Sequence, residues 1–153
     1  MKKYFLLFSC IIIALSACKK GDVVAAQAAV DDEKIQAYIQ ENYVLTNGFV
    51  KDPSGVYYMI VTPGTGAYPT LTSNVKIAYT GKYLDGQTFQ SAPSGTYLLS
   101  TLVQGFQIGI PHINGLGRII LIIPSGLGYG PAGSGSIPPN ACLVFTVDLL
   151  GFY

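Results

Sequence analysis

The sequence is poor in charge. Charged residues make up only 11% of its 153 residues, against about 25% in typical globular proteins. The formal net charge is +1, and adjacent cations occur only at Lys2-Lys3 and Lys19-Lys20. Binding to nucleic acid requires several clustered cations that neutralise phosphates. The composition therefore excludes nucleic acid as a partner.

Residues that bind metals or form disulfides are also scarce. The sequence has one histidine, His112, and three cysteines. Cys10 and Cys18 lie in an N-terminal segment with the features of an export signal, which leaves Cys142 without a disulfide partner. Because Cys142 begins an apolar, strand-like run, we interpret it as a small buried thiol. We expect no metal site and no cofactor.

The N-terminal segment predicts export to the bacterial cell envelope. Lys2-Lys3 precede an apolar core from Tyr4 to Ala14, which is shorter than the about 20 residues of a membrane-spanning helix. The next residues, LSAC (15–18), resemble a lipoprotein signal, in which the cysteine is lipidated after cleavage. We expect a signal peptide over residues 1–17, lipidation at Cys18, and a lipid-anchored location that is periplasmic or associated with the outer membrane. An ordinary secretory signal is the alternative.

Two further segments precede the main domain. Residues 18–30 are rich in alanine and contain few large apolar side chains, which predicts a flexible tether. Residues 31–50 are expected to hold an N-terminal helix over residues 31–44, because two aspartates suit its start, apolar residues recur near one face, and Asn47-Gly48 suit its end. These apolar residues are Ile35, Tyr38, Ile39 and Tyr43. Nothing in this helix indicates chemistry.

From residue 51 onwards the pattern is that of strands. Apolar residues alternate with others over residues 75–80, and Asp85-Gly86 is a strong hairpin signal. Residues 91–96 are expected to form a loop. One short helix is expected over residues 103–113, weakened by its glycines and proline. We therefore predict an α+β domain over residues 51–153, with an antiparallel sheet wrapped around one short helix.

A glycine-rich loop separates two apolar runs near the C-terminus. The first run, IILII (119–123), predicts a strand that is buried on both faces. The loop begins at Pro124 and holds Tyr129 between two glycines. Such a loop either connects strands or forms a wall of a ligand site. An exposed tyrosine between glycines gains little as part of a core, and the wider pattern of the sequence, given below, decides between the two.

Six segments together resemble FKBP-type peptidyl-prolyl cis-trans isomerases. They occur in the family's order and are VKIAYTG (75–81), DGQTF (85–89), VQGF (103–106), IPSGLGYG (123–130), IPPNA (137–141) and LVF (143–145). The resemblance covers about residues 51–153 and implies an FKBP-like fold. It also implies proline-containing polypeptides as substrates and a macrolide as a candidate ligand. Nothing in the sequence demands more than a monomer.

The implied reaction requires no nucleophile, metal or acid–base pair. Rotation about an Xaa-Pro bond has a barrier of about 18–20 kcal/mol, because resonance stiffens the C–N bond. An apolar pocket that desolvates the amide and fits its twisted form better than the planar forms lowers this barrier. A sequence without a catalytic triad is consistent with this reaction.

The resemblance assigns a set of site residues. Phe106 would be the floor under the proline ring, and the Val103 N–H and Tyr129 hydroxyl would hydrogen-bond to substrate carbonyls. The implied catalytic residues are Tyr79, Phe89, Phe106, Tyr129 and Phe145, and the implied substrate-binding residues are Gln90, Leu102, Val103 and Ile137. For the four aromatic residues other than Tyr129, plain core packing is the alternative.

Three positions depart from the family's usual pattern. Gln90 stands where an aspartate is usual, Phe106 where a tryptophan is usual, and Gly95 where many members have another aromatic wall. The aromatic pocket set and the lipoprotein signal nevertheless make an isomerase that assists protein folding the first hypothesis. A proline-binding chaperone or adaptor with negligible turnover is the second, and a purely structural envelope protein is the third.

Overall fold

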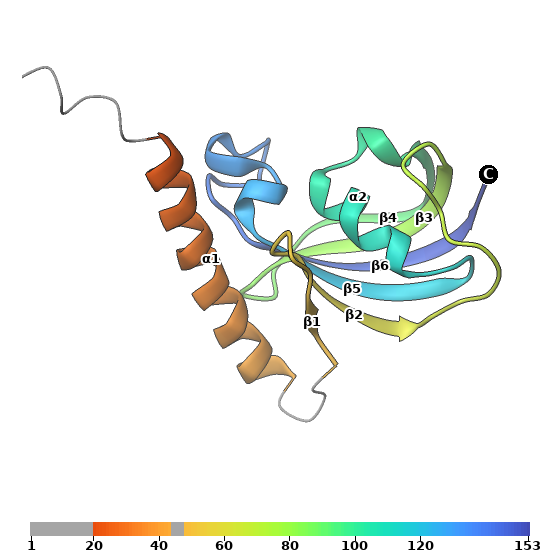
Figure 1. The fold of residues 1–153 in the computed structure, drawn as a ribbon, viewed down its shortest axis with the longest axis horizontal. Coiled ribbons are helices and arrows are strands. Elements are labelled where there is room, and N and C mark those ends of the chain that lie inside the picture. The colour runs from red at the N-terminus through yellow and green to blue at the C-terminus, as the bar shows by residue number, and fades with distance from the viewer. Residues whose placement is uncertain (1–19, 44–47) are drawn as a thin grey trace, which may run out of the picture.

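One antiparallel sheet forms the body of the domain. The structure is a computed structural model that describes residues 20–43 and 48–153, and within these residues the sheet has six strands (Figure 1). They are β1 (Val50–Lys51), β2 (Tyr57–Thr62), β3 (Asn74–Tyr83), β4 (Thr88–Leu98), β5 (Gly117–Ile123) and β6 (Leu143–Phe152). Their order is β1-β2-β5-β6-β3-β4, so the two apolar runs near the C-terminus, β5 and β6, lie at the centre.

Two α-helices pack against opposite faces of this sheet. They are α1 (Lys20–Asn42) and α2 (Gln104–Gly109), the latter continued by the short 3₁₀ helix η2 (Ile110–His112). Ile119, Leu121 and Ile123 of β5 belong to the core on the α2 side, whereas Ile122 packs with Ile35 of α1. Since successive side chains of a strand point to opposite faces, β5 is buried on both, as its apolar run predicts.

The glycines of α2 allow it to lie close to the sheet. A Cβ atom on Gly105 would lie 2.6 Å from Ile123 Cγ1, and one on Gly109 would lie 2.7 Å from Leu121 Cδ1. Both distances are shorter than real carbon contacts, so only glycine fits at this spacing. The helix is short, as predicted, and it buries Phe106, Ile110 and the following Ile113.

The N-terminal helix is longer than the sequence patterns indicate and begins earlier. The prediction of a tether was wrong over residues 20–30, because these residues are helical. Alanine has the highest helix propensity of all residues, so a lack of large apolar side chains did not prevent helix formation. The helix ends at Asn42, close to the predicted end at residue 44. Within the described residues, neither helix combines the length and apolarity required to cross a bilayer.

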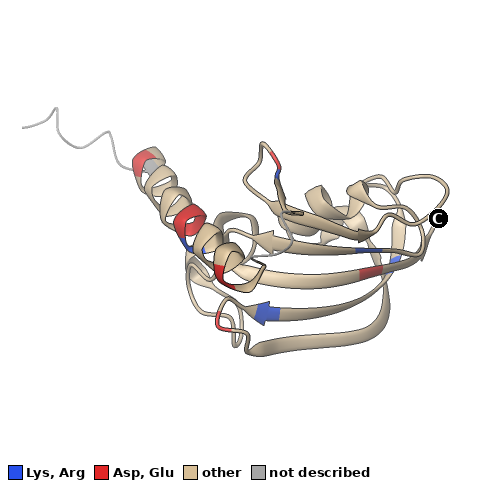
Figure 2. Ribbon diagram, turned by 90° about the horizontal axis from the view of Figure 1, so that it is seen from below, with Lys and Arg blue, Asp and Glu red and all other residues tan. Residues whose placement is uncertain are grey.

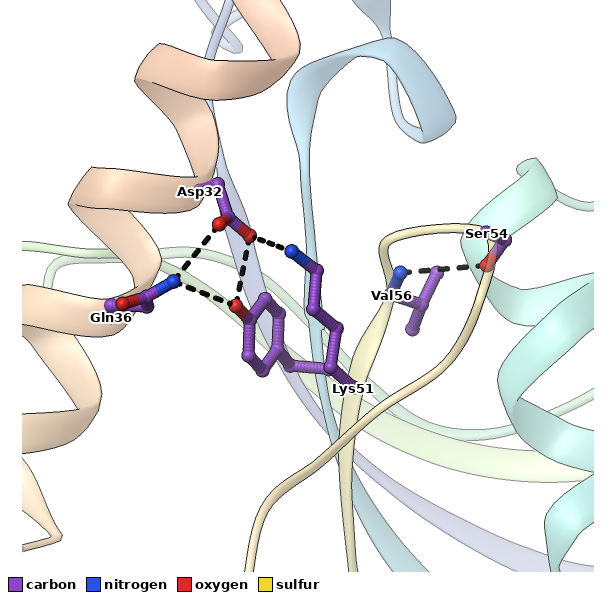
Figure 3. A network of polar contacts seen from close by, with 6 residues as sticks. Asp32, Gln36, Lys51, Ser54 and Val56 are labelled. Carbon is purple, nitrogen blue, oxygen red and sulfur yellow. Dashed lines mark hydrogen bonds and ion pairs between the residues drawn. The ribbon is translucent and has the colours of Figure 1, made fainter.

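A polar network joins the middle of α1 to the first two strands (Figure 3). Asp32 accepts hydrogen bonds from Lys51 Nζ, from the Tyr57 hydroxyl at 2.8 Å and from Gln36 Nε2 at 2.9 Å. The hydrogen bond from Lys51, despite partial desolvation, holds the pKa of Asp32 below its usual value. Ile35 of the same helix is fully buried. The helix is therefore fixed to the domain through Ile35, with Tyr38 and Ile39 packed beside it, and through several polar contacts.

The edge strand β4 was not predicted in full. Residues 91–96, expected as a loop, are part of this strand. Pro93 and Gly95 suggested a break in the sheet, but β4 lies at the edge of the sheet order, where proline is tolerated because one side of the strand needs no hydrogen bonds. The extended strand continues to Tyr97, which lines the candidate site described below.

Candidate functional site

A small apolar cavity lies between α2 and the sheet. Its volume is about 60 Å³, and it is lined by residues of β3, β4, the start of α2, the glycine-rich loop and β6. The lining residues are Tyr79, Gln90, Tyr97, Leu102, Val103, Phe106, Tyr129 and Phe145. None of these side chains is charged. Acidic residues instead recur along α1 (Figure 2).

Three aromatic rings form the inner part of this cavity. Phe106 and Phe145 meet edge to face with their centroids 4.7 Å apart, and Tyr79 lies 5.8 Å from Phe106 and 6.0 Å from Phe145. Edge-to-face pairs at these distances are favourable beyond the area they bury. Phe106 and Phe145 are only 4% and 2% exposed. They therefore belong both to the core and to the cavity, so the two interpretations of these residues are compatible.

Neutral polar groups surround the aromatic rings. Burial, together with the nearby Tyr97 and Tyr129, raises the pKa of Tyr79 above its usual value. The Tyr79 hydroxyl therefore stays protonated and able to donate at neutral pH. The Val103 carbonyl accepts hydrogen bonds from the Phe106 and Gln107 backbone N–H groups at 2.9 and 3.2 Å. The Val103 N–H itself donates to no backbone carbonyl among the described residues.

The structure brings seven of the nine expected pocket residues together. They are Tyr79, Gln90, Leu102, Val103, Phe106, Tyr129 and Phe145.

Phe89 and Ile137 do not line the cavity. Phe89 packs behind it, with its ring centroid 5.6 Å from that of Phe145 and 4.9 Å from that of Tyr83. Ile137 is 7% exposed and belongs to the main core. Their positions suit support of the cavity wall rather than contact with a ligand. Cys18, the expected lipidation site, lies outside the described residues.

Tyr97 lines the cavity but is absent from the residues that sequence analysis assigned to it. It follows a segment rich in proline, serine and glycine, which favoured a loop over a strand. The signal that could have identified it is the two-residue spacing from Gly95 to Tyr97. This spacing places residue 97 on the same face as position 95 once the segment is recognised as a strand.

Larger hollows occur on the surface but suit a ligand less well. One of about 430 Å³ lies beside Lys34 of α1, the β3–β4 turn and the segment from Ser136 to Cys142. Its lining mixes charged, polar and apolar groups, and it includes none of the rings that line the aromatic cavity. Within the described residues, no three His, Cys, Asp or Glu side chains gather into a group that could hold a metal ion. The aromatic cavity is thus the best candidate for the functional site.

Comparisons with known proteins identify the family of the chain. Residues 66–150 match the sequence model of the FKBP-type peptidyl-prolyl cis-trans isomerase domain. The FkpA isomerase of Aeromonas hydrophila is 35% identical over 127 residues, an alignment that covers 80% of this chain and 47% of that protein. The FkpA isomerase of Escherichia coli K12 is 32% identical over 126 residues, with the same two coverages. The chain spans about half the length of these curated relatives.

The fold comparison gives the same result. The crystal structure of FkpA from Escherichia coli superposes with a TM-score of 0.73 at 31% identity, covering 86% of this chain and 63% of that one. The antiparallel sheet packed on a short helix matches the FKBP-like fold of that structure, so the predicted fold is confirmed. The chain belongs to the family of FKBP-type peptidyl-prolyl cis-trans isomerases.

Proposed function

We propose that this protein is a peptidyl-prolyl cis-trans isomerase that assists protein folding in the bacterial cell envelope. The single observation that carries the proposal is the uncharged aromatic cavity, because it suits a proline ring and a desolvated amide. Residues 51–153 form the isomerase domain in this proposal, and the family match begins at residue 66 within it.

The chemistry follows from the composition of the cavity. The proline ring rests on Phe106 between Tyr79 and Phe145, where contact with aromatic faces replaces contact with water. Removal of water from the amide favours the twisted form, in which charge separation in the C–N bond is lost. The Val103 N–H and the Tyr129 hydroxyl bind the substrate carbonyls and hold the chain while the bond rotates.

A proline-binding chaperone or adaptor with negligible turnover is the second candidate. It is favoured by Gln90 and Phe106, which line the cavity where the family usually has an aspartate and a tryptophan. Both candidates predict that proline peptides bind, and only the isomerase accelerates exchange. NMR exchange spectroscopy of Xaa-Pro peptides with the purified protein separates them. Peptide binding without faster exchange would favour the adaptor.

We further propose that residues 1–17 are a lipoprotein signal and that Cys18 carries the lipid anchor. Helix α1 begins at Lys20, so the domain would be joined to the anchor through a helix. Mass spectrometry of the protein isolated from its native membranes tests this. An acylated Cys18 supports the anchor. A mature protein that carries no lipid and is recovered in the soluble fraction supports an ordinary secretory signal.

Two further points belong to the proposal. A macrolide is a candidate ligand of the same cavity, and competition between a macrolide and a proline peptide measures this directly. We also expect a monomer, which sedimentation of the purified protein tests.

A further inference from the structure

The loop segment that carries Tyr129 is held by hydrogen bonds on both sides. Before Tyr129, the Ser125 carbonyl accepts the Gly128 N–H at 3.1 Å. After it, the Gly130 carbonyl accepts the Asn140 N–H at 3.0 Å. Tyr129 therefore lies between two fixed backbone groups, and its place in the cavity wall depends on where Ser125 is held.

Asp31 of α1 holds the Ser125 side of this segment. Its Oδ2 atom accepts both the Ser125 N–H and the Ser125 hydroxyl, its Oδ1 atom accepts Gln27 Nε2, and the Cys142 thiol lies close to the same carboxylate. Burial of a carboxylate is costly unless its oxygens accept hydrogen bonds, and a fully satisfied buried network is rigid. With Asp31 and Ser125 each only 1% exposed, α1 fixes the Ser125 backbone at a point that water does not reach.

This support comes from outside the part of the chain that matches the family. The family match covers residues 66–150, whereas α1 covers Lys20–Asn42 and lies beside the loop (Figure 1). Asp31 was expected to suit the start of a helix, but α1 begins 11 residues earlier, so its carboxylate caps no helix end. Its hydrogen bonds go to the loop instead.

We propose that Asp31 is a positioning residue of the cavity, which acts through Ser125 to hold the Tyr129 hydroxyl against the substrate carbonyl. The inference rests on the proposed function, because the hydroxyl acts there on the same peptide bond. A hydrogen bond weakens steeply with poor geometry, so a displaced loop loses part or all of it. Because Asp31 acts only through the hydroxyl, the loss of kcat/KM is limited to that of one hydrogen bond, about 5–15-fold.

The test measures kcat/KM for a proline peptide by NMR exchange spectroscopy. Wild type, Asp31→Ala and Asp31→Asn are compared, each with Tyr129 present and with Tyr129→Phe. Asp32→Ala is the matched control, because the hydrogen bonds of Asp32 to β1 and β2 hold the same helix but do not reach the loop. Thermal unfolding verifies that each variant is folded at the temperature of the assay.

Asp31→Ala is expected to lower kcat/KM by about 3–15-fold. Asp31→Asn should stay within about twofold of wild type, because its amide oxygen can still accept both Ser125 donors. Asp32→Ala should also stay within about twofold.

The decisive comparison is the one with Tyr129→Phe. In that background Asp31→Ala should add less than about a twofold loss, because the hydroxyl through which it acts is absent. An equal loss with and without the hydroxyl would overturn the inference, since it would show a general structural role. An unchanged kcat/KM in Asp31→Ala would overturn it as well.

A second variant keeps the test available if Asp31→Ala does not fold. Ser125→Ala removes one of the two donors and keeps the backbone N–H. It is expected to lower kcat/KM by at least about twofold, and this loss should disappear with Tyr129→Phe. A loss that persists without the Tyr129 hydroxyl, or no loss at all, would then overturn the inference.

Failure of the proposed function would look different. A wild-type protein that does not accelerate exchange contradicts the isomerase, but hydrogen exchange of the Gly128 amide still tests the positioning without any peptide. This amide donates to Ser125, so it should exchange faster in Asp31→Ala than in wild type, while the amides paired between β5 and β6 keep their rates. An unchanged Gly128 rate would overturn the role of Asp31, whatever the protein catalyses.

Discussion

Asp31 of α1 holds Ser125 through two hydrogen bonds, although the two residues lie 94 positions apart in the chain. Its Oδ2 atom accepts the Ser125 backbone N–H at 2.8 Å and the Ser125 hydroxyl at 2.6 Å, and Gln27 donates to the other carboxylate oxygen at 2.8 Å. Both Asp31 and Ser125 are 1% exposed. Ser125 stands four residues before Tyr129, so this buried contact anchors α1 to the loop that supplies one wall of the cavity.

Replacement of Asp31 is expected to destabilise the protein. Asp31→Ala would leave two buried Ser125 donors without an acceptor, which costs about 2–3 kcal/mol in the free energy of unfolding. Asp32→Ala is the matched control, because Asp32 lies on the solvent side of the same turn and its exposed ion pair is worth about 1 kcal/mol or less. Urea unfolding of both variants measures the difference. Equal losses of unfolding free energy in the two variants would contradict the larger contribution expected of the buried contact between Asp31 and Ser125.

Tyr129→Phe tests the hydrogen bond proposed for the cavity loop. The variant removes only the hydroxyl, so kcat/KM for a proline peptide should fall about 5–15-fold, which is the loss of one hydrogen bond of about 1–1.5 kcal/mol. The free energy of unfolding should change by less than about 0.5 kcal/mol. Tyr153→Phe is the control, since Tyr153 is 81% exposed and distant in sequence from the cavity residues. Unchanged turnover in Tyr129→Phe would remove the hydroxyl from the mechanism.

Much of the fold and of the cavity could be predicted because their signals are local. Alternation in β3, the Asp85-Gly86 turn and the apolar run of β5 each specify an element within a few residues. Phe106, Tyr129 and Phe145 stand in short segments that resemble the family's own. These segments carried the site assignment even though they are far apart in the chain.

The features that could not be predicted depend on tertiary context. The alanine-rich start of α1 gives no amphipathic signal, and the contact between Asp31 and Ser125 has no expression in local sequence. Tyr97 was missed because a proline, a serine and a glycine suggested a loop, whereas an edge strand tolerates them. Only the register of β4 against β3 reveals that the Tyr97 ring faces the cavity.

The buried thiol of Cys142 should make stability fall at high pH. Burial, with a contribution from nearby Asp31, raises the pKa of Cys142 to about 12, against about 8.5 in an unfolded chain. Because the folded state holds the proton more tightly, this stabilisation is complete below about pH 8.5 and is lost progressively as the pH rises towards 12. Urea unfolding at pH 8 and pH 10.5 measures the loss of unfolding free energy.

Tyrosines and lysines titrate in the same range, so the comparison is with Cys142→Ala, whose loss of stability over this interval should be smaller. An identical pH dependence in the two proteins would contradict the assignment.

Gly105→Ala sets helix propensity against packing in α2. Alanine in place of glycine stabilises a helix by about 1 kcal/mol, but the new Cβ atom would lie 2.6 Å from Ile123 Cγ1 in the core. Overpacking of this kind costs about 1–3 kcal/mol, so the net effect is expected to be destabilising. Because Gly105 precedes Phe106, the displaced helix should also lower isomerase activity.

Gly21→Ala in α1 is the matched control, since no atom lies within 4 Å of its new Cβ and the substitution should be neutral or stabilising. Thermal unfolding of both variants, together with exchange spectroscopy, decides between the two effects. A stabilised Gly105→Ala protein would mean that α2 moves away from the sheet more easily than its close contact with Ile123 indicates.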